Sequence, residues 1–351
     1  MELEDYTGRL GKGADLGPGE ARGAALLLAA EGPPDEAKAA FLSALASKGE
    51  SAQEIADFAQ AFRGLARDPG LAAWAPRAVD IVGTGGDQAG GFNVSTMATL
   101  VVASAGVPVM KHGNRGVTSK CGSADLFAAL GVELEAPPEA LGRAMAELGY
   151  VFLFAPAWHP AFRRIGPVRK LLAARGERTI FNILGPLLNP GRPAHILLGA
   201  ATPALAERLA GALEALGTGA GLAVHGVIAP GRGIDELTSA TLNLVRGVGR
   251  HRAVLAEWTP ESLGLARSDF SEIAGGDVAG NLALARALAG GGGPRGLADT
   301  IALNAAAALW VAGARPDVRG AIGEARDLLL GGAVRAKMEA TQDFYRGGTA
   351  L

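Results

Sequence analysis

The chain has 351 residues, of which 49% are apolar and 19% charged, and 33 basic side chains nearly balance 35 acidic ones. This length suits one large domain with a smaller one beside it. The formal net charge of −2 gives no broad basic surface for a nucleic-acid backbone, so an anion site must be local. We therefore expect a soluble globular protein with no nucleic-acid partner.

Cys121 is the single cysteine, which excludes an intrachain disulfide and a cysteine-based metal cluster. A lone cysteine is typical of the reducing cytoplasm, where we expect the protein to be located. Residues 1–5 are acidic rather than basic, and no stretch reaches about 18 uninterrupted apolar residues. These features predict neither a secretion signal nor a membrane partner.

Helical spacing runs from about Gly19 to Arg67. Pro34 and Asp35 predict the start of a helix that Gly49 ends, and Ser51 with Glu54 forms a capping box for the next. Proline and glycine then mark residues 68–76 as a linker. We expect a small all-helical domain over residues 1–75 and a large α/β domain over residues 76–351.

Beyond Ala78, short β-branched runs alternate with helical segments. The predicted strands are Val79 to Val82, Val107 to Met110, Val151 to Phe154, Ile196 to Leu198 and Leu222 to Val224. This alternation favours an α/β fold with a mainly parallel central sheet and helices on both faces.

The first predicted strand breaks into Gly83-Thr84-Gly85-Gly86-Asp87, followed by Asn93-Val94-Ser95-Thr96 at a helix start. Glycine lets backbone N–H groups close around an anion, and a helix amino terminus adds free N–H groups and a positive dipole end. A purely structural turn is the alternative for such a segment taken alone.

The next predicted strand leads into Lys111-His112-Gly113-Asn114-Arg115, which we expect to form a loop, with Ser119 and Ser123 before the following helix. Both junctions belong to the carboxyl edge of a parallel sheet, where open α/β sheets bind ligands. The two segments together predict a cradle for a phosphorylated sugar.

Asp235 and Glu236 are adjacent carboxylates in a glycine-rich segment that we expect to be an exposed loop. Mg²⁺ prefers oxygen ligands and commonly bridges carboxylates to substrate phosphates. The alternative is a solvated acidic pair, and the phosphate cradle at the same edge favours the metal site. Arg169 lies in a predicted helix with several basic residues, which are usually solvent-facing. Its guanidinium could instead form a fork that matches a planar carboxylate.

With these motifs in order along the chain, the sequence resembles the anthranilate phosphoribosyltransferases, and the resemblance covers essentially its whole length. It implies transfer of a 5-phosphoribosyl group from phosphoribosyl diphosphate to the amine of anthranilate, with release of diphosphate and with Mg²⁺ as cofactor. It also implies a homodimer, and a helical domain completed by helices near residues 161–175.

The resemblance carries three sets of contacts over to this chain. The donor would be bound by Gly83, Gly86, Asp87, Asn93, Ser95, Thr96, Lys111, Arg115, Ser119 and Ser123. The metal would be bound by Ser95, Asp235 and Glu236, and anthranilate by Gly83, His112, Asn114, His159 and Arg169. No general acid or base is evident.

Several alternatives stay open on the sequence. Arg169 and Arg178 are about one helical turn farther apart than is usual in the family, so Arg175 could bind the acceptor carboxylate instead of Arg169. A pyrimidine nucleoside phosphorylase-like enzyme and a non-catalytic nucleic-acid-binding paralogue are the alternative functions.

Overall fold

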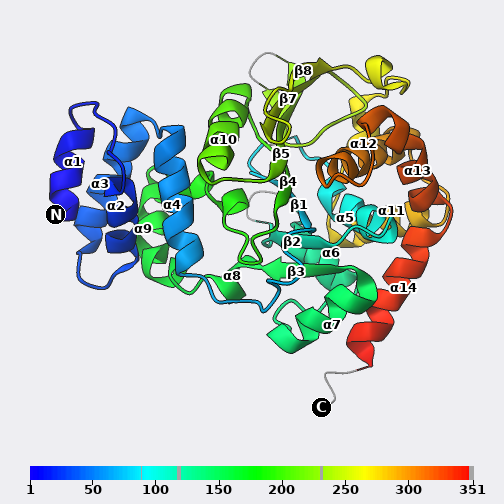
Figure 1. Cartoon of the computed structure of the whole chain (residues 1–351), viewed down its shortest axis with the longest axis horizontal. Helices are drawn as coiled ribbons and strands as arrows, with labels where there is room; N and C mark the ends of the chain where they lie inside the picture. Colours follow the sequence, from blue (N-terminus) through cyan, green and yellow to red (C-terminus); the bar gives the residue numbers. More distant parts are fainter. Residues whose placement is uncertain (88, 117–119, 230–231, 348–351) are drawn as a thin grey trace.

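The computed structural model describes residues 1–87, 89–116, 120–229 and 232–347. A lobe of helices lies at one end of the molecule, and a central sheet with helices on both sides forms the rest (Figure 1). This arrangement confirms the predicted fold class, a small helical lobe with a larger α/β part. Within the described residues, no helix is long and apolar enough to cross a membrane.

The helical lobe forms where the sequence carries its start and stop signals. It contains α1 (Leu3–Leu10), α2 (Glu20–Ala29), α3 (Asp35–Lys48) and α4 (Ala52–Gly64), with α9 (Phe162–Ala174) packed on α2 and α3. Helix α3 ends before Gly49, which has φ +86°. The predicted capping box is present: Ser51 Oγ accepts from the Glu54 N–H, and Glu54 Oε2 accepts from the Ser51 N–H at 2.8 Å.

The sheet has eight strands in the order β3-β2-β1-β4-β5-β7-β8, with β6 paired to β5. Its strands are β1 (Val79–Gly83), β2 (Val109–Gly113), β3 (Tyr150–Phe154), β4 (His195–Gly199), β5 (Ala220–Ala229), β6 (Arg232–Ile234), β7 (Asn243–Gly249) and β8 (Leu255–Trp258). Strands β1 to β5 are parallel and match the five predicted ones, whereas β6 to β8 are antiparallel and were not predicted.

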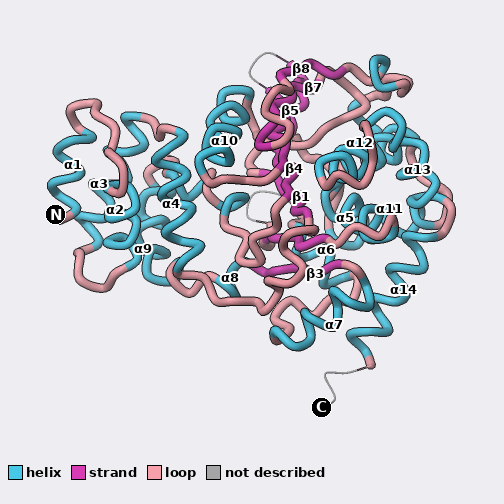
Figure 2. Tube along the Cα trace, in the orientation of Figure 1, coloured by secondary structure: helices cyan, strands magenta, loops and turns pink. Residues whose placement is uncertain are grey.

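The remaining helices cover both faces of the sheet (Figure 2). They are α5 (Val94–Ser104), α6 (Ser123–Ala129), α7 (Pro138–Leu148), the short α8 (Ala155–Trp158), α10 (Pro203–Ala215), α11 (Val278–Ala289), α12 (Arg295–Val311), α13 (Val318–Leu330) and α14 (Ala333–Arg346). Side chains alternate between faces along a strand, so Ile81 joins the core under α5 and α12 while its neighbour Val82 joins the core shared with the helical lobe.

Candidate active site

The predicted donor loops meet at the carboxyl ends of β1 and β4. Strand β1 pairs with both β2 and β4, and the chain leaves β1 toward β2 and β3 before it returns on the other side at β4. This is the point where strand order reverses in an open α/β sheet, and ligands bind in the crevice outside it.

Two glycines let the Asp235 segment lie directly across these strand ends. A Cβ on Gly83 would stand 2.2 Å from Asp235 Oδ2, and a Cβ on Gly199 would stand 1.6 Å from the Asp235 carbonyl oxygen. Real side chains do not approach so closely, so any larger residue at either position would displace the segment. Gly83 and Gly199 thereby bring Asp235 to the glycine-rich loop, although it is far away in sequence.

Three carboxylates and a hydroxyl converge there. Asp235 Oδ2 accepts from the Gly85 N–H at 2.7 Å, Glu236 Oε1 accepts from the Ser95 N–H at 3.3 Å, and Asp87 Oδ2 accepts from the Asp235 N–H at 3.4 Å. Asp235 and Glu236 are half-buried, which corrects the expectation of an exposed loop. The physical reason is their packing against the glycine-ended strands.

This oxygen-rich set fits Mg²⁺. Burial, with Asp87 and Glu236 nearby, raises the pKa of Asp235 well above its usual range, and burial raises that of Glu236 to about 7. Such carboxylates gain from a cation beside them. Among the described residues, no group of three or more His, Cys, Asp or Glu forms a complete metal site. In proteins, Mg²⁺ commonly keeps waters and substrate oxygens among its ligands.

Lys111 is buried behind the carboxylates. Its Nζ donates to the Ile81 carbonyl at 2.5 Å and to Ser95 Oγ at 3.1 Å, and burial lowers its pKa. The prediction that Lys111 and His112 lie in a loop is wrong, because β2 continues to Gly113 and holds both side chains in the core. A buried strand holds the ammonium more rigidly than a loop could.

Asn114, Arg115 and Ser123 do lie together beyond β2. The Asn114 carbonyl accepts from the Ala124 N–H at 3.2 Å and from Ser123 Oγ at 3.4 Å, and Arg115 pairs with Asp125 at 2.9 Å. A phosphate bound by Arg115 would compete with Asp125 for the guanidinium. The predicted contact Ser119 lies outside the described residues.

Asn93 and Thr96 hold the amino end of α5. Asn93 Nδ2 donates to the Cys121 carbonyl at 3.1 Å, and its Oδ1 accepts from Asn281 Nδ2 at 2.9 Å. Thr96 is fully buried, and its hydroxyl has no partner in the described part of the chain. These contacts place the residues beside the donor loops, with Thr96 turned inward rather than toward the crevice.

Three of the predicted anthranilate contacts, His112, His159 and Arg169, lie along one set of aromatic rings. The His112 and His159 rings are 5.2 Å apart, and Phe162 lies 5.8 Å from His159. The Arg169 guanidinium stands 5.7 Å from the Phe162 ring and 5.6 Å from the Phe181 ring. The aromatic rings therefore lead from the histidines to Arg169. Arg175, at the carboxyl end of α9, is exposed.

Both histidines are neutral hydrogen-bond acceptors. Each ring donates to a backbone carbonyl, His112 to Gly185 and His159 to Leu188, and Nε2 of each is buried without a partner among the described residues. Burial, with His159 close by, holds the pKa of His112 well below its usual range, and burial lowers that of His159 to about 4.

The sequence did not reveal the buried polar group beneath the site. Asp80, within β1, accepts from Asn189 Nδ2 at 2.8 Å and from the His112 N–H at 3.3 Å, and Asn189 also donates to the Met110 carbonyl at 2.7 Å. Burial raises the pKa of Asp80 to about 6. The available signal was a carboxylate inside the apolar run Val79 to Val82.

The chain is similar to known proteins over most of its length. The helical bundle domain of a glycosyl transferase family matches residues 4–66, and the a/b domain of a glycosyl transferase family matches residues 75–335. The anthranilate phosphoribosyltransferase of Thermus thermophilus is 45% identical over 320 residues, which are 91% of this chain and 92% of that protein. The fold and the site thus define a glycosyltransferase that acts on pentosyl groups.

Solved structures lead to the same family. The crystal structure of anthranilate phosphoribosyltransferase from Thermus thermophilus gives a TM-score of 0.86 at 41% identity, with 97% of this chain and 99% of that chain covered. The Saccharomyces cerevisiae enzyme in complex with PRPP and Mg gives 0.83 at 25% identity, with 99% and 98% covered. The chain belongs to the anthranilate phosphoribosyltransferase family.

The buried histidines predict a pH dependence of folding stability. Between pH 4 and 6.5, the unfolded chain protonates His159 while the native state keeps it neutral, so the free energy of unfolding rises with pH across this window. At pH 5 the free energy of unfolding should be about 1 to 2 kcal/mol lower than at pH 7 because of His159. Urea unfolding of the wild type and of His159→Gln tests it: the variant should lose less stability from pH 7 to pH 5. Equal losses would contradict a buried neutral His159.

Proposed function

We propose that the protein transfers the 5-phosphoribosyl group of phosphoribosyl diphosphate to the amine of anthranilate and releases diphosphate. One observation carries the proposal: the Asp235–Glu236 pair, buried Lys111 and the glycine-rich loop meet at the strand-order reversal of the sheet. Family membership supports this function over the nucleoside phosphorylase and nucleic-acid-binding alternatives.

The residue roles are part of the proposal. The donor contacts are Gly83, Gly86, Asp87, Asn93, Ser95, Thr96, Lys111, Arg115, Ser119 and Ser123, the metal ligands are Ser95, Asp235 and Glu236, and the anthranilate contacts are Gly83, His112, Asn114, His159 and Arg169. Among these residues, Thr96 has a fully buried side chain.

Catalysis needs no covalent step from the protein. Mg²⁺, when bound, supplies charge that stabilises the departing diphosphate. Lys111 adds a fixed positive charge close by, because strand β2 and two hydrogen bonds hold its ammonium in place. Arg169 orients the acceptor through its carboxylate, and the neutral ring nitrogens of His112 and His159 offer acceptors for an amine N–H.

A direct assay tests the activity and the metal site together. Anthranilate fluorescence should fall only when both Mg²⁺ and phosphoribosyl diphosphate are present. Replacing Asp235 and Glu236 by Ala removes the oxygen ligands, and turnover should drop by two or more orders of magnitude, since such charge stabilisation supplies several kcal/mol. Phosphorolysis of a nucleoside without anthranilate turnover, or wild-type turnover by the double variant at low Mg²⁺, would contradict the proposal.

Arg169 is the proposed anchor for the acceptor carboxylate, supported by its partial burial against Phe162 and Phe181, whereas Arg175 is exposed. A bidentate charge-assisted pair contributes roughly 1.5 to 3 kcal/mol, so Arg169→Ala should raise the anthranilate KM about ten- to a hundredfold. The KM for phosphoribosyl diphosphate should stay within a few-fold. Arg175→Ala is the control, and a defect in that variant alone would move the role to Arg175.

We also propose that the chain divides at residues 75 and 76, that it works in the cytoplasm, and that it forms a homodimer through the helical lobe. An apolar groove of about 390 Å³ is lined by Leu26, Ala29, Ala30, Leu65, Pro160, Ala161 and Arg164. Leu26 and Leu65 are 42% and 36% exposed, and contiguous exposed apolar surface commonly marks an interface.

Sedimentation equilibrium tests the dimer. The wild type should sediment at twice the mass of the 35.4 kDa chain, and Leu26→Glu with Leu65→Glu should sediment as a monomer, because the two carboxylates would be buried unpaired. Leu255→Glu, on the distant β8, is the control and should remain dimeric. A monomeric wild type, or a dimeric double variant, would contradict this assignment.

A further inference from the structure

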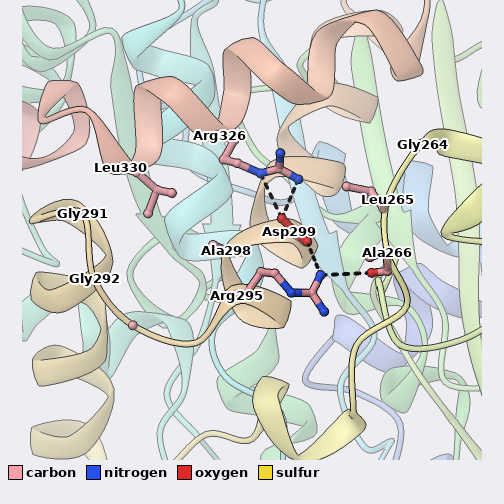
Figure 3. Close-up of a pocket in the computed structure, with 11 residues that line it drawn as sticks. Gly264, Leu265, Ala266, Gly291, Gly292, Arg295, Ala298, Asp299, Arg326 and Leu330 are labelled. Atoms are coloured by element: carbon pink, nitrogen blue, oxygen red, sulfur yellow. Dashed lines mark hydrogen bonds and ion pairs between the residues drawn. The ribbon is translucent and has the colours of Figure 1, made fainter.

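Some arginines that line cavities in this protein are already paired with a carboxylate. A cavity of about 500 Å³ at the amino end of α12 shows the pattern (Figure 3). Arg295 and Arg326 both point at Asp299, with N–O distances of 2.9 and 2.6 Å, and the Asp299 side chain is 3% exposed. Both oxygens of that carboxylate are used, so this cluster fastens α12 to α13, and both guanidiniums already have a carboxylate partner.

Arg178 contrasts with this cluster. Its side chain is exposed, and it forms no hydrogen bond or ion pair with any residue that the structure describes. Its Nη2 would lie 3.8 Å from a Cβ built on Gly86, so the guanidinium stands over the glycine-rich loop. An unpaired arginine this close to a phosphate-binding loop is available to a bound anion.

The loop below Arg178 is shaped for an anion. Gly85 and Gly86 have φ values of +69° and +74°, and the N–H groups of Gly86 and Asp87 have no hydrogen-bond partner among the described residues. Successive free N–H groups in such a turn form a concave anion site. The guanidinium above and the N–H groups below therefore face the same space.

The backbone that carries Arg178 is anchored on both sides. Glu177 accepts a hydrogen bond from Ser43 on α3 of the helical lobe. On the other side, the Thr179 N–H donates to Asn182 Oδ1 at 2.8 Å, and Ile180 and Phe181 are buried in the core shared with that lobe. Arg178 is thus held by the helical lobe while it reaches the sheet edge.

The charged groups of the crevice indicate that Arg178 is available to bind an anion. Asp87, Asp235 and Glu236 place three carboxyl groups at the edge, Arg115 is paired with Asp125, and Lys111 is buried below Ser95. A diphosphate carries several negative charges, and a guanidinium keeps its charge at all physiological pH values. Arg178 is the exposed cation that stands over the glycine-rich loop without a partner in the described chain.

We propose that Arg178 binds the diphosphate group of the donor from above the glycine-rich loop and so joins the helical lobe to the sheet edge when the donor is bound. This inference rests on the proposed function for the identity of the donor. It adds a cation that acts on the leaving diphosphate and whose backbone is anchored to the helical lobe. The acceptor carboxylate stays with Arg169.

Calorimetry with inorganic diphosphate and Mg²⁺ tests the contact without the reaction. We expect Arg178→Ala to weaken diphosphate binding about ten- to a hundredfold, and Arg178→Lys to restore only part of it, because a point charge lacks the guanidinium fork. Arg175→Ala, which removes the same charge three residues earlier, should bind as the wild type does. Because Arg178 is exposed, the thermal midpoint of each variant should stay within a few degrees of the wild type.

Hydrogen exchange separates a direct contact from a general loss of charge. Diphosphate with Mg²⁺ should protect the amides of residues 177–182 in the wild type and not in Arg178→Ala. Unchanged diphosphate affinity in Arg178→Ala, an equal loss in Arg175→Ala, or a defect confined to the anthranilate KM would overturn the proposal. If the wild type bound diphosphate but never consumed anthranilate, the proposed function would fail while the Arg178 contact would stand.

Discussion

The site depends on one close approach, that of the Asp235 segment to the ends of β1 and β4. Gly83 and Gly199 make it possible, since a Cβ at either position would overlap Asp235. The strand order then brings the other parts of the site together. Strands β1 and β4 are neighbours at the point where the order reverses, so the glycine-rich loop, the carboxylates and the start of α5 lie at one crevice. Without these two glycines the acidic pair could not reach the glycine-rich loop.

Beneath this contact, the buried carboxylate of Asp80 orients the residues of the proposed acceptor side. Asp80 receives hydrogen bonds from His112 and Asn189, and the loop that contains Asn189 also offers the carbonyls that hold the two histidine rings. A buried carboxylate is costly unless it is hydrogen-bonded or paired, so these donors are required for stability. The same residues that stabilise the core therefore orient His112 and His159, two of the proposed anthranilate contacts, and the proposed donor and acceptor sides meet at adjacent strands.

Much of the secondary structure could be predicted from the sequence, and the elements and contacts that were missed have physical reasons. Local signals were enough for α3, for the Ser51–Glu54 capping box and for the five parallel strands, because propensity and hydrophobic pattern act over a few residues. The antiparallel strands β6 to β8 were missed, since β6 and β7 contain glycine and polar residues, β8 is only four residues long, and their pairing depends on tertiary context. Two contacts of the site, Asp80 with Asn189 and Arg178 with Gly86, each join residues about a hundred positions apart. No local sequence pattern predicts such contacts.

The most direct test of the account is the affinity of Gly199→Ala for Mg²⁺ and diphosphate together, measured by calorimetry. Gly142→Ala, on the open face of α7 where a Cβ meets nothing within 4 Å, is the matched control. If the close approach of Asp235 builds the site, Gly199→Ala should lose binding by at least tenfold while circular dichroism shows a folded protein and the control binds normally. Wild-type affinity in folded Gly199→Ala would contradict the account.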